Sequence, residues 1–407
     1  MEISKKLEIL ADAAKYDASC ASSGANKSDS RSGKGVGSTG GAGICHSYAP
    51  DGRCISLLKL LLTNSCIYDC HYCINRRSSN VRRAVFTAEE VVKLTLDFYK
   101  RNYIEGLFLS SGIIRNADHT MEQVIAVART LREVHDFRGY IHLKTIPEAS
   151  PELIETAARY ADRISINIEL PTQESLDLYA PEKNMARTKV AMGRIRHKLE
   201  EATERKKDGD KKLRHATGQS TQVIVGADAA TDADFLARSD ELYRSYKLKR
   251  VYYSAFSPIP EPSAILPLKA PPLIREHRLY QADWLMRHYG FATGEILTPE
   301  APNLDLDLDP KLSWALRNRQ DFPVDIQTAS REILLRIPGI GVKNVNRILR
   351  IRRFTKLRLA DLVRLRVSLK KVEPFIITAD HNPAKYLLDS DRLRAKFAPK
   401  PEQLEFF

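Results

Sequence analysis

SLLKLLLTNSCIYDCHYC, residues 56–73, joins a strand-like apolar run to three cysteines, Cys66, Cys70 and Cys73. Thiolates are the usual protein ligands of iron–sulfur clusters. Because a cubane cluster has four irons, three cysteines leave one iron open to bind a further molecule, as an open zinc position does. The alternative is a zinc knuckle or structural thiols, but zinc would need a fourth ligand, and His71 is poorly placed to point inward. The spacing therefore favours an iron–sulfur centre with one open iron.

Strand-like runs alternate with helical segments outward from this stretch. The runs are 56–63, 106–110, 140–145, 163–169, 221–226 and 250–256. Helices are expected to open at two capping boxes, Thr87 with Glu90 and Thr120 with Gln123, and near Pro151, Thr231 and Pro272. Strands separated by helices indicate parallel βα units. Six units predict an α/β fold, a partial (βα)6 TIM-like barrel, with its chemistry at the C-terminal ends of the strands.

The composition supports a folded protein of two or three domains, because 407 residues are 43% apolar and 28% charged. We find neither an apolar run of about 18 residues nor a signal-peptide pattern, so we expect a cytoplasmic location and no membrane span. Six cysteines in a chain of this length do not make a disulfide framework. In a reducing compartment, clustered thiols more often bind metal.

The positive charge is concentrated in one segment. Residues 331–371 hold 13 Lys and Arg against 2 Asp and Glu, a net +11, whereas the whole chain carries +13. Such a local excess indicates a polyanion-binding surface, most simply for nucleic acid. The alternative is a solvated charged face.

LRIPGIGVKNVNRI, residues 335–348, lies inside this basic segment and resembles the helix-hairpin-helix motif of DNA repair proteins. Gly339 and Gly341 permit a tight turn and the close approach of another backbone. The second helix would present free N–H groups to a phosphate, with Lys343 and Arg347 on the same face. These four residues are the expected DNA contacts, and they would read backbone rather than sequence. The alternative is a hairpin used only for protein packing.

Three further cysteines, Cys20, Cys45 and Cys54, precede the first strand. Residues 19–44 include 14 Gly or Ser, so we expect a loop there that could bring Cys20 and Cys45 together. A second iron–sulfur cluster is one interpretation, with its open iron free or filled by His46. Buried structural thiols and a different metal site are the others.

The Cys-x3-Cys-x2-Cys spacing, with Tyr72 just before the third cysteine, resembles the radical S-adenosylmethionine (SAM) enzymes. This resemblance implies a [4Fe-4S] cluster on Cys66, Cys70 and Cys73. Its open iron chelates the amino and carboxylate groups of S-adenosylmethionine, and one electron then yields a 5′-deoxyadenosyl radical. An electron donor such as flavodoxin or ferredoxin is the partner that this chemistry implies.

The same resemblance implies cofactor contacts at the strand ends. The expected cofactor-binding residues are Tyr72, Ser110, Ser111, Gly112, Asn167, Glu169 and Gly226. Serines here replace two small or glycine positions of the family's glycine-rich turn, and Asn167 and Glu169 could instead make ordinary strand-end hydrogen bonds. Lys144, Tyr252 and Tyr253 could face the same pocket or simply pack. We assign no catalytic acid or base.

A closer resemblance is carried by residues 66–77, 101–112, 218–222 and 278–284, which look like one bacterial and archaeal family of radical SAM proteins described as acting in DNA modification and repair. The likeness runs from about Lys5 to Thr378. Its members are often encoded beside a uracil-DNA-glycosylase-like protein, which is therefore an expected partner. The family's usual Pro-Ala-Gly is Ala-Thr-Gly here, at residues 216–218, and the charged stretch 194–214 looks like a region of variable length.

Together these patterns predict three segments: 1–54, an extension with cysteines; 55–300, the radical SAM barrel; and 301–407, a small all-α helix-hairpin-helix domain and tail. We expect an iron–sulfur enzyme that modifies or repairs a base or sugar of DNA. Because a base inside a duplex cannot reach a barrel mouth, the target should be flipped or single-stranded. The alternatives are a radical SAM enzyme acting on tRNA and a DNA-binding redox sensor, which would not cleave S-adenosylmethionine.

Overall fold

The computed structural model describes residues 1–14, 44–48, 54–210, 215–259, 262–383 and 392–398. The chain divides into two compact units. The first comprises Met1–Ala230 and Glu241–Pro271, and the second comprises Thr231–Asp240 and Pro272–Phe407. By this division the long C-terminal stretch of the second unit begins at Pro272, and the described part of segment 1–54 belongs to the first unit. None of the helices in the described ranges combines the length and hydropathy of a membrane span.

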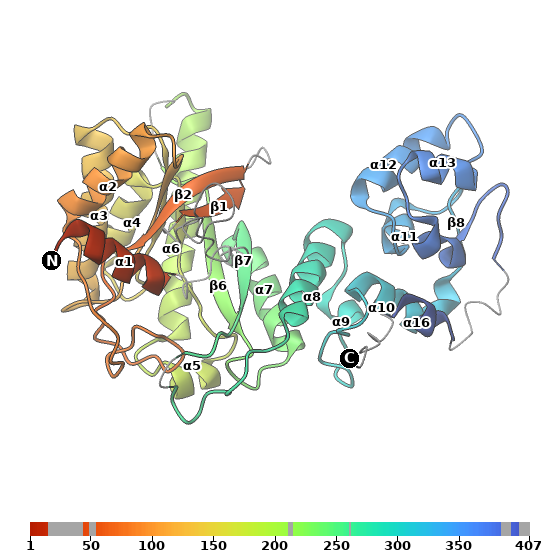
Figure 1. Cartoon of the computed structure of the whole chain (residues 1–407). Helices are drawn as coiled ribbons and strands as arrows, with labels where there is room; N and C mark the ends of the chain where they lie inside the picture. The colour runs from red at the N-terminus through yellow and green to blue at the C-terminus, as the bar shows by residue number, and fades with distance from the viewer. Residues whose placement is uncertain (15–43, 49–53, 211–214, 260–261, 384–391, 399–407) are drawn as a thin grey trace, which may run out of the picture. The chain divides into compact units, whose positions relative to one another are not determined.

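The first unit is built on a seven-stranded sheet whose strands are ordered as in the sequence (Figure 1). The strands are β1 (Ile44–Tyr48), β2 (Cys54–Leu61), β3 (Gly106–Ser110), β4 (Tyr140–Lys144), β5 (Arg163–Ser165), β6 (Gln219–Val225) and β7 (Arg250–Ala255). β1 pairs antiparallel with β2, and all later neighbours are parallel. The six parallel strands form the curled half-barrel that the sequence predicts, so the fold class is confirmed.

The apolar run of β2 explains why it lies inside the sheet. Leu57, Leu58 and Leu60 are each almost fully buried, which is the pattern of a parallel strand covered on both faces. Lys59 interrupts the run, yet it is also buried, and its ammonium lies 5.7 Å from the centre of the Phe108 ring. The strand therefore remains buried despite its one charged residue.

Two strand predictions differ from the structure. β1 was not expected, because it lies in the segment whose composition indicated an extension with a loop. β5 is only three residues long instead of reaching Glu169, although Glu169 still forms an isolated bridge with Val223 of β6. Residues 166–168, between the end of β5 and this bridge, are outside the regular strand, and the expected cofactor residue Asn167 lies among them.

The helices of the first unit include α1 (Ile3–Ala13), α2 (Ala88–Lys100), α3 (Ala117–Arg129), α4 (Pro151–Tyr160), α5 (Gln173–Tyr179) and α6 (Met185–Lys207) (Figure 1). α1, α2, α4 and α6 contact strands of the sheet, and α3 packs against α2 and α4. The capping box of Thr87 and Glu90 is confirmed at the start of α2. The predicted capping box at Thr120 is wrong, because Asn116 caps α3 and the Thr120 hydroxyl bonds back to the Ile114 and Asn116 carbonyls.

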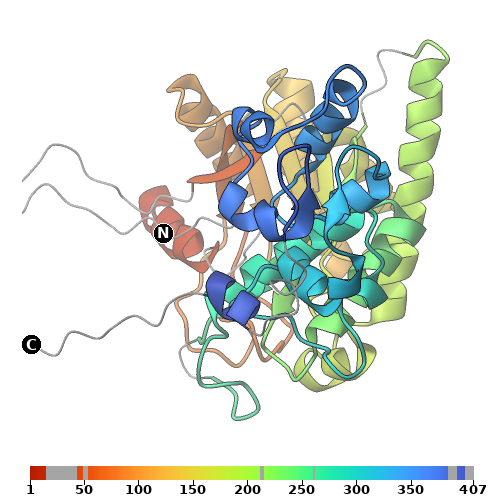
Figure 2. The ribbon, with the colours of Figure 1, turned by 90° about the vertical axis from the view of Figure 1, so that its right-hand side faces the viewer.

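The second unit is mainly helical, and its later part is drawn in blue in Figures 1 and 2. Its helices include α8 (Leu273–Trp284), α9 (Thr293–Ile296), α10 (Pro310–Arg317), α11 (Arg331–Arg336), α12 (Val342–Ile351), α13 (Leu359–Arg364), α14 (Leu369–Val372) and α16 (Arg392–Phe397). A short parallel pair, β8 (Val324–Asp325) with β9 (Ile376–Ile377), departs from the expected all-α domain. Phe322 and Phe375 meet edge to face in its core, with ring centres 5.1 Å apart.

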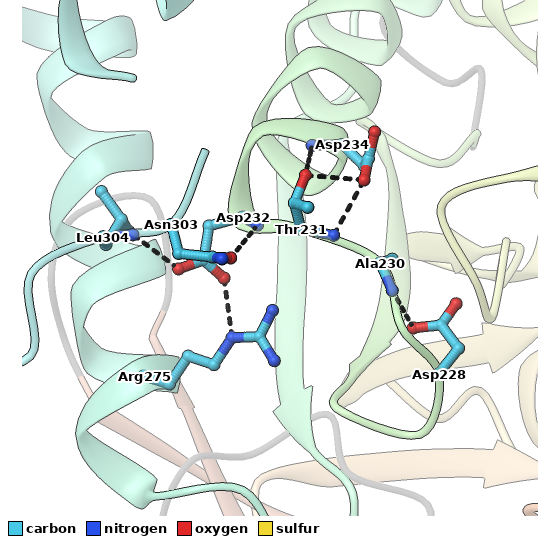
Figure 3. A network of polar contacts seen from close by, with 8 residues as sticks. All are labelled: Asp228, Ala230, Thr231, Asp232, Asp234, Arg275, Asn303 and Leu304. Atoms are coloured by element: carbon cyan, nitrogen blue, oxygen red, sulfur yellow. Dashed lines mark hydrogen bonds and ion pairs between the residues drawn. The ribbon is translucent and has the colours of Figure 1, made fainter. Parts of the chain in front are cut away.

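A buried carboxylate organises the start of α7 (Asp232–Tyr246) within the second unit (Figure 3). Asp232 is 1% exposed and accepts hydrogen bonds from Arg275 Nε at 2.7 Å and the Leu304 amide at 2.9 Å. Its own amide donates to Asn303 Oδ1 at 3.1 Å. The Thr231 hydroxyl accepts from the Asp234 amide, which confirms the predicted helix start. A buried charge that is paired in this way is the arrangement that folding tolerates.

Candidate functional site

The cysteine loop follows β2 and lies against the turn after β3. The Gly112 amide donates to the Thr63 carbonyl at 2.8 Å, and the Ile113 amide lies 3.4 Å from Cys66 Sγ. A Cβ at Gly112 would stand 2.6 Å from the Ser65 carbonyl oxygen, so only glycine allows this approach. The turn that was expected to serve the cofactor is therefore next to the loop that was expected to hold the cluster.

Arg83 fixes the far side of the same loop. Its guanidinium donates to the carbonyls of Asn75 at 2.9 Å, Arg76 at 2.6 Å and Ser79 at 2.8 Å, and also to the Asn64 carbonyl. One rigid fork of donors therefore holds together several backbone acceptors of an irregular segment. Sequence reasoning missed this residue, because a single arginine in a basic loop carries no pattern.

The three thiols lie close enough to affect one another electrostatically. Burial is the main cause that raises the pKa of Cys73 to about 11 and the pKa of Cys70 higher still. The charges of the neighbouring cysteines add to this rise, while the Lys183 ammonium opposes it. Without a metal the thiols of Cys70 and Cys73 therefore stay protonated, and iron binding has to release their protons.

This donor set fits an iron–sulfur cluster better than a single metal ion. In the part of the chain that the structure describes, we find no group of three His, Cys, Asp or Glu side chains arranged around one ion. In a cubane each thiolate ligates its own iron, so its ligands stand further apart than those of one zinc ion. Cys66, Cys70 and Cys73 interact electrostatically with one another, yet they are not arranged around one ion.

Lys183 and Glu169 form an ion pair beside the thiols. Lys183 Nζ lies 2.6 Å from Glu169 Oε1, and both side chains are largely shielded from water. Glu169 has a φ of 63°, a left-handed conformation that glutamate seldom adopts and that often marks a functional position. Cys70 and Glu169 raise the pKa of Lys183 above its usual value, although burial alone would lower it. Glu169 was expected at this site, but Lys183 was missed because it lies in a loop without a recognisable motif.

Unpaired acceptors at the strand ends offer a test of whether S-adenosylmethionine fits. Buried oxygens that lack a hydrogen-bond partner among the described residues include Asn167 Oδ1 and Asp228 Oδ2 after β5 and β6, and Glu182 Oε2, whose other oxygen accepts from the Asp69 amide of the cysteine loop. Buried acceptors without partners are costly, so such a group indicates a missing donor. An ammonium group, ribose hydroxyls and an adenine amino group are donors of the required kind. The residues present therefore fit this cofactor.

The other expected cofactor residues are placed as follows. Tyr72 has a buried hydroxyl whose pKa is raised by burial and by Glu169 and Cys70. Ser110 is 1% exposed, and the Ser111 hydroxyl donates to the Gly112 carbonyl at 2.6 Å. At Gly226 a Cβ would stand 2.7 Å from the Pro271 ring, and its φ of 80° also requires glycine. Packing of Pro271 thus explains this glycine, and its contact with adenine stays a prediction.

Three residues with open alternatives can also be located. Lys144 ends β4 beside Ser165 and is half-buried. Tyr253 is 2% exposed and packs inside the sheet. Tyr252 is half-buried, with the Arg250 guanidinium 5.7 Å from its ring centre. The burial of Tyr253 therefore favours packing as its role.

The upstream cysteines are only partly described, since Cys20 and the His46 side chain lie outside the described residues. Cys45 is buried beside Leu57, its partner in the hairpin, whereas Cys54 is exposed opposite Tyr48. Cys45 lies opposite Leu57, and Cys54 is three residues before Leu57 on β2, which is about 10 Å at 3.3 Å per residue. Because side chains alternate along a strand, this odd offset points Cys45 and Cys54 to opposite faces of the hairpin. This hairpin does not bring Cys45 and Cys54 to one metal site.

The predicted hairpin in the basic segment joins α11 to α12. Gly339 has a φ of 82°, which requires glycine, and Gly341 is the N-cap of α12. Val345 and Ile348 are fully buried, whereas Lys343 and Arg347 are exposed on the other side of α12. The structure therefore presents the predicted cations beside the free amides of the helix start.

Most of the basic segment faces solvent. Among the thirteen Lys and Arg of residues 331–371, all but Arg336 and Arg352 are exposed. Arg352 donates to two carbonyls, and Arg336 pairs with Glu295 at 2.7 Å, so these two are structural. Phe354 is 86% exposed in the same segment, and the sequence analysis overlooked it. An aromatic ring among cations is a pattern found in surfaces that stack on bases.

The half-barrel, the cysteine loop after its first parallel strand and the unpaired acceptors at its strand ends define a radical SAM domain. Residues 60–236 match the radical SAM superfamily, and the chain carries this domain. The class of enzyme predicted from the sequence is confirmed, and its cofactors are a [4Fe-4S] cluster and S-adenosylmethionine. No curated protein matches the chain in sequence.

Solved structures with a similar fold include the FeFe-hydrogenase maturase HydG from Carboxydothermus hydrogenoformans, at 16% identity and a TM-score of 0.44, covering 56% of this chain and 50% of that one. Methylornithine synthase (PylB) matches at 12% identity and 0.40, covering 54% and 60%. Coproporphyrinogen III oxidase (HemN) from Escherichia coli matches at 14% and 0.34, covering 64% and 57%. Each match covers less than two thirds of the other chain, and similarity at this level carries no argument about the substrate.

Proposed function

We propose that the chain is a radical SAM enzyme that acts on DNA, modifying or repairing a base or sugar. The observation that carries this proposal is the exposed start of α12 at Gly341, with Lys343 and Arg347 beside it, in a segment of net charge +11. Free amides at a helix start and flanking cations are suited to a phosphate oxygen. Contacts to phosphate position a polyanion without selecting its sequence.

The exposed Phe354 supports the same proposal. It lies between Arg353 and Lys356, which are also exposed. A large ring in water gains from stacking on an unpaired base, whereas the neighbouring cations neutralise the phosphates on either side. A base that has left the duplex, or a single strand, is the substrate form that this surface suits.

In the first unit, this chain's residues would hold the cofactors and exclude water. Cys66, Cys70 and Cys73 would ligate the cluster, which with S-adenosylmethionine supplies a carbon-centred radical. Arg83 fixes the loop that carries the three ligands. Cys70 is buried, so its side of the centre would be shielded from water. The chemistry needs one electron, so a flavodoxin or ferredoxin is the partner we propose, and a uracil-DNA-glycosylase-like protein is a second one in the cytoplasm.

The test is anaerobic reconstitution of the full chain with iron, sulfide, a chemical reductant and S-adenosylmethionine. Damaged and undamaged duplexes, the matching single strands and bulk tRNA are added separately, and 5′-deoxyadenosine is measured by mass spectrometry. We expect DNA, and not tRNA, to raise the yield and to appear as a modified product. Stimulation by tRNA alone would replace DNA with RNA as the substrate. If reduction gives no deoxyadenosine at all, the protein is a cluster-based sensor and the proposal fails.

A further inference from the structure

A cavity of about 490 Å³ lies between α4 and α6 and is closed at one end by the loop after β4. Ile154 of α4 and Ile195 of α6 contribute apolar walls, and both are buried. The cavity has room for a single flat ring system with its sugar, but not for a protein domain. None of the expected cluster or cofactor residues lines it, so the cavity is separate from the cysteine loop.

Glu148 is a polar group in the loop at one end of this cavity. Both of its carboxylate oxygens are buried, and no other residue among those described donates a hydrogen bond to either one. Folding leaves a buried acceptor without a donor only at considerable cost, so an absent partner is indicated. Glu148 also interacts electrostatically with Lys183, Glu169 and Arg187.

The cavity lining includes three cations, Arg187, Arg194 and Lys198, and two carboxylates, Glu148 and Glu155; Lys198 pairs with Glu155 at 3.7 Å. Arg187 and Arg194 of α6 are seven residues apart, so they stand on one face of the helix. Both are exposed, and neither has an ion-pair partner among the residues that the structure describes. Val190, between them, is 55% exposed, which leaves an apolar strip leading into the cavity. An anionic group at this rim would meet the guanidinium groups of Arg187, which also interacts with Glu148, and Arg194.

We propose that the α4/α6 cavity binds one nucleotide, with its base between the apolar walls and its phosphate at Arg187 and Arg194. The Glu148 carboxylate accepts a hydrogen bond from the amino group of the base, as carboxylates do with the cytosine amino group. The inference rests on the proposed action on nucleic acid, which it narrows to a nucleotide taken out of the duplex.

The test uses the full chain with its cluster reconstituted and S-adenosylmethionine saturating, so that the adenosine site is filled. Binding of deoxycytidine monophosphate, thymidine monophosphate and deoxycytidine is measured by calorimetry. We expect the cytosine nucleotide to bind more tightly than the thymine nucleotide. Changing Arg187 and Arg194 together to Ala should lower the affinity for the monophosphate about tenfold and leave the affinity for the nucleoside unchanged. Glu148→Gln should weaken both cytosine ligands and reduce the preference over thymine.

Lys207→Ala is the matched control, because Lys207 is an exposed cation on the same helix outside the cavity, and it should change nothing. Absent nucleotide binding, or binding that is unaffected by the arginine and Glu148 changes, overturns the proposal. The arginine variant lies on the surface and decides the question even if Glu148→Gln fails to fold. If the nucleotide binds while DNA is never modified, the site stands and the proposed function fails. If DNA is modified and no nucleotide binds, the site alone is wrong.

Discussion

Lys311 Nζ donates a hydrogen bond of 2.6 Å to the carbonyl oxygen of Ile340, inside the turn between α11 and α12. Lys311 is 7% exposed, and its ammonium lies 4.7 Å from the centre of the Tyr289 ring. A Cβ at Gly341 would stand 3.4 Å from the hydroxyl of the same tyrosine. The buried Lys311 side chain thus fixes the turn from within, and the amides at the start of α12 remain available on its outer side.

This relationship makes stability depend on pH. Burial lowers the pKa of Lys311 to about 7 in the fold, against a small opposing effect of Asp309, whereas the unfolded chain keeps a value near 10.4. Between these two values the unfolded state binds more protons, so the free energy of unfolding increases as pH rises from about 7 to about 10. Wild type should gain up to about 1.4 kcal/mol per pH unit relative to Lys311→Met. Denaturant unfolding of both proteins from pH 7 to 10 checks this, and a constant difference would contradict it.

The three cysteines after β2 should hold one four-iron cluster. Changing Cys66, Cys70 or Cys73 to Ala removes one ligand, so the brown absorbance and all S-adenosylmethionine cleavage should be lost. The control is Cys54→Ala, because this thiol is exposed in the β1–β2 hairpin and away from the loop. A triple variant that still forms deoxyadenosine would disprove the assignment.

The upstream cysteines should not add a second cluster that needs both Cys45 and Cys54. Their side chains lie on opposite faces of the hairpin, so they cannot ligate one cubane without breaking its pairing. Reconstituted wild type and Cys45→Ser should therefore both contain about four irons per chain, measured by mass spectrometry of the metal. About eight irons in wild type and four in Cys20→Ala would instead establish the second cluster.

Removing the Lys183 ammonium should make the cluster harder to reduce. Its charge lies beside Cys70 and Cys73 and favours the added electron, because a cluster's potential depends on the local net charge. Lys183→Met should lower the midpoint potential in a titration followed by electron paramagnetic resonance. Lys189→Met, which breaks an α6 ion pair with Glu241, serves as the control. Equal midpoint potentials in wild type, Lys183→Met and Lys189→Met would show that the Lys183 charge does not act on the cluster.

The hairpin should bind DNA through phosphate. Lys343→Glu and Gly341→Val should weaken binding about equally for all sequences, because the first repels phosphate and the second crowds the helix start. Lys343→Ala should reduce the slope of log affinity against log salt by about one unit. Deoxyadenosine formation without DNA should persist in these variants. If Lys343→Glu leaves affinity and salt slope unchanged, the hairpin is a packing element.

Phe354 should matter for unpaired bases only. Phe354→Ala should weaken the binding of single-stranded DNA by about 1–3 kcal/mol and leave the binding of intact duplex almost unchanged, because only an unpaired base exposes its face. Fluorescence anisotropy with both forms checks this. The nearby Lys356→Ala should instead weaken the binding of both forms. If Phe354→Ala weakens the binding of single strand and duplex equally, Phe354 does not stack on unpaired bases.

Local patterns were sufficient for much of the fold and for the cluster ligands. Parallel strands buried on both faces read as apolar runs, so β3 was located to the residue and β2 closely. The spacing of Cys66, Cys70 and Cys73 is local as well, and so is the reciprocal capping of Thr87 and Glu90. Gly339 was predictable because a tight turn demands positive φ within a few residues. Each of these features depends on neighbours in the sequence.

The sequence by itself therefore determined the half-barrel, its cysteine loop and the basic hairpin. Only the tertiary structure decided what surrounds them, because those contacts join residues far apart in the chain. Lys311 meets Ile340, Lys183 meets the thiols, and Glu148 is left without a donor beside the α4/α6 cavity. Thr120 shows the reverse case, since its local capping pattern was replaced by Asn116 four residues earlier. Burial and charge at these positions follow from packing, which no local pattern encodes.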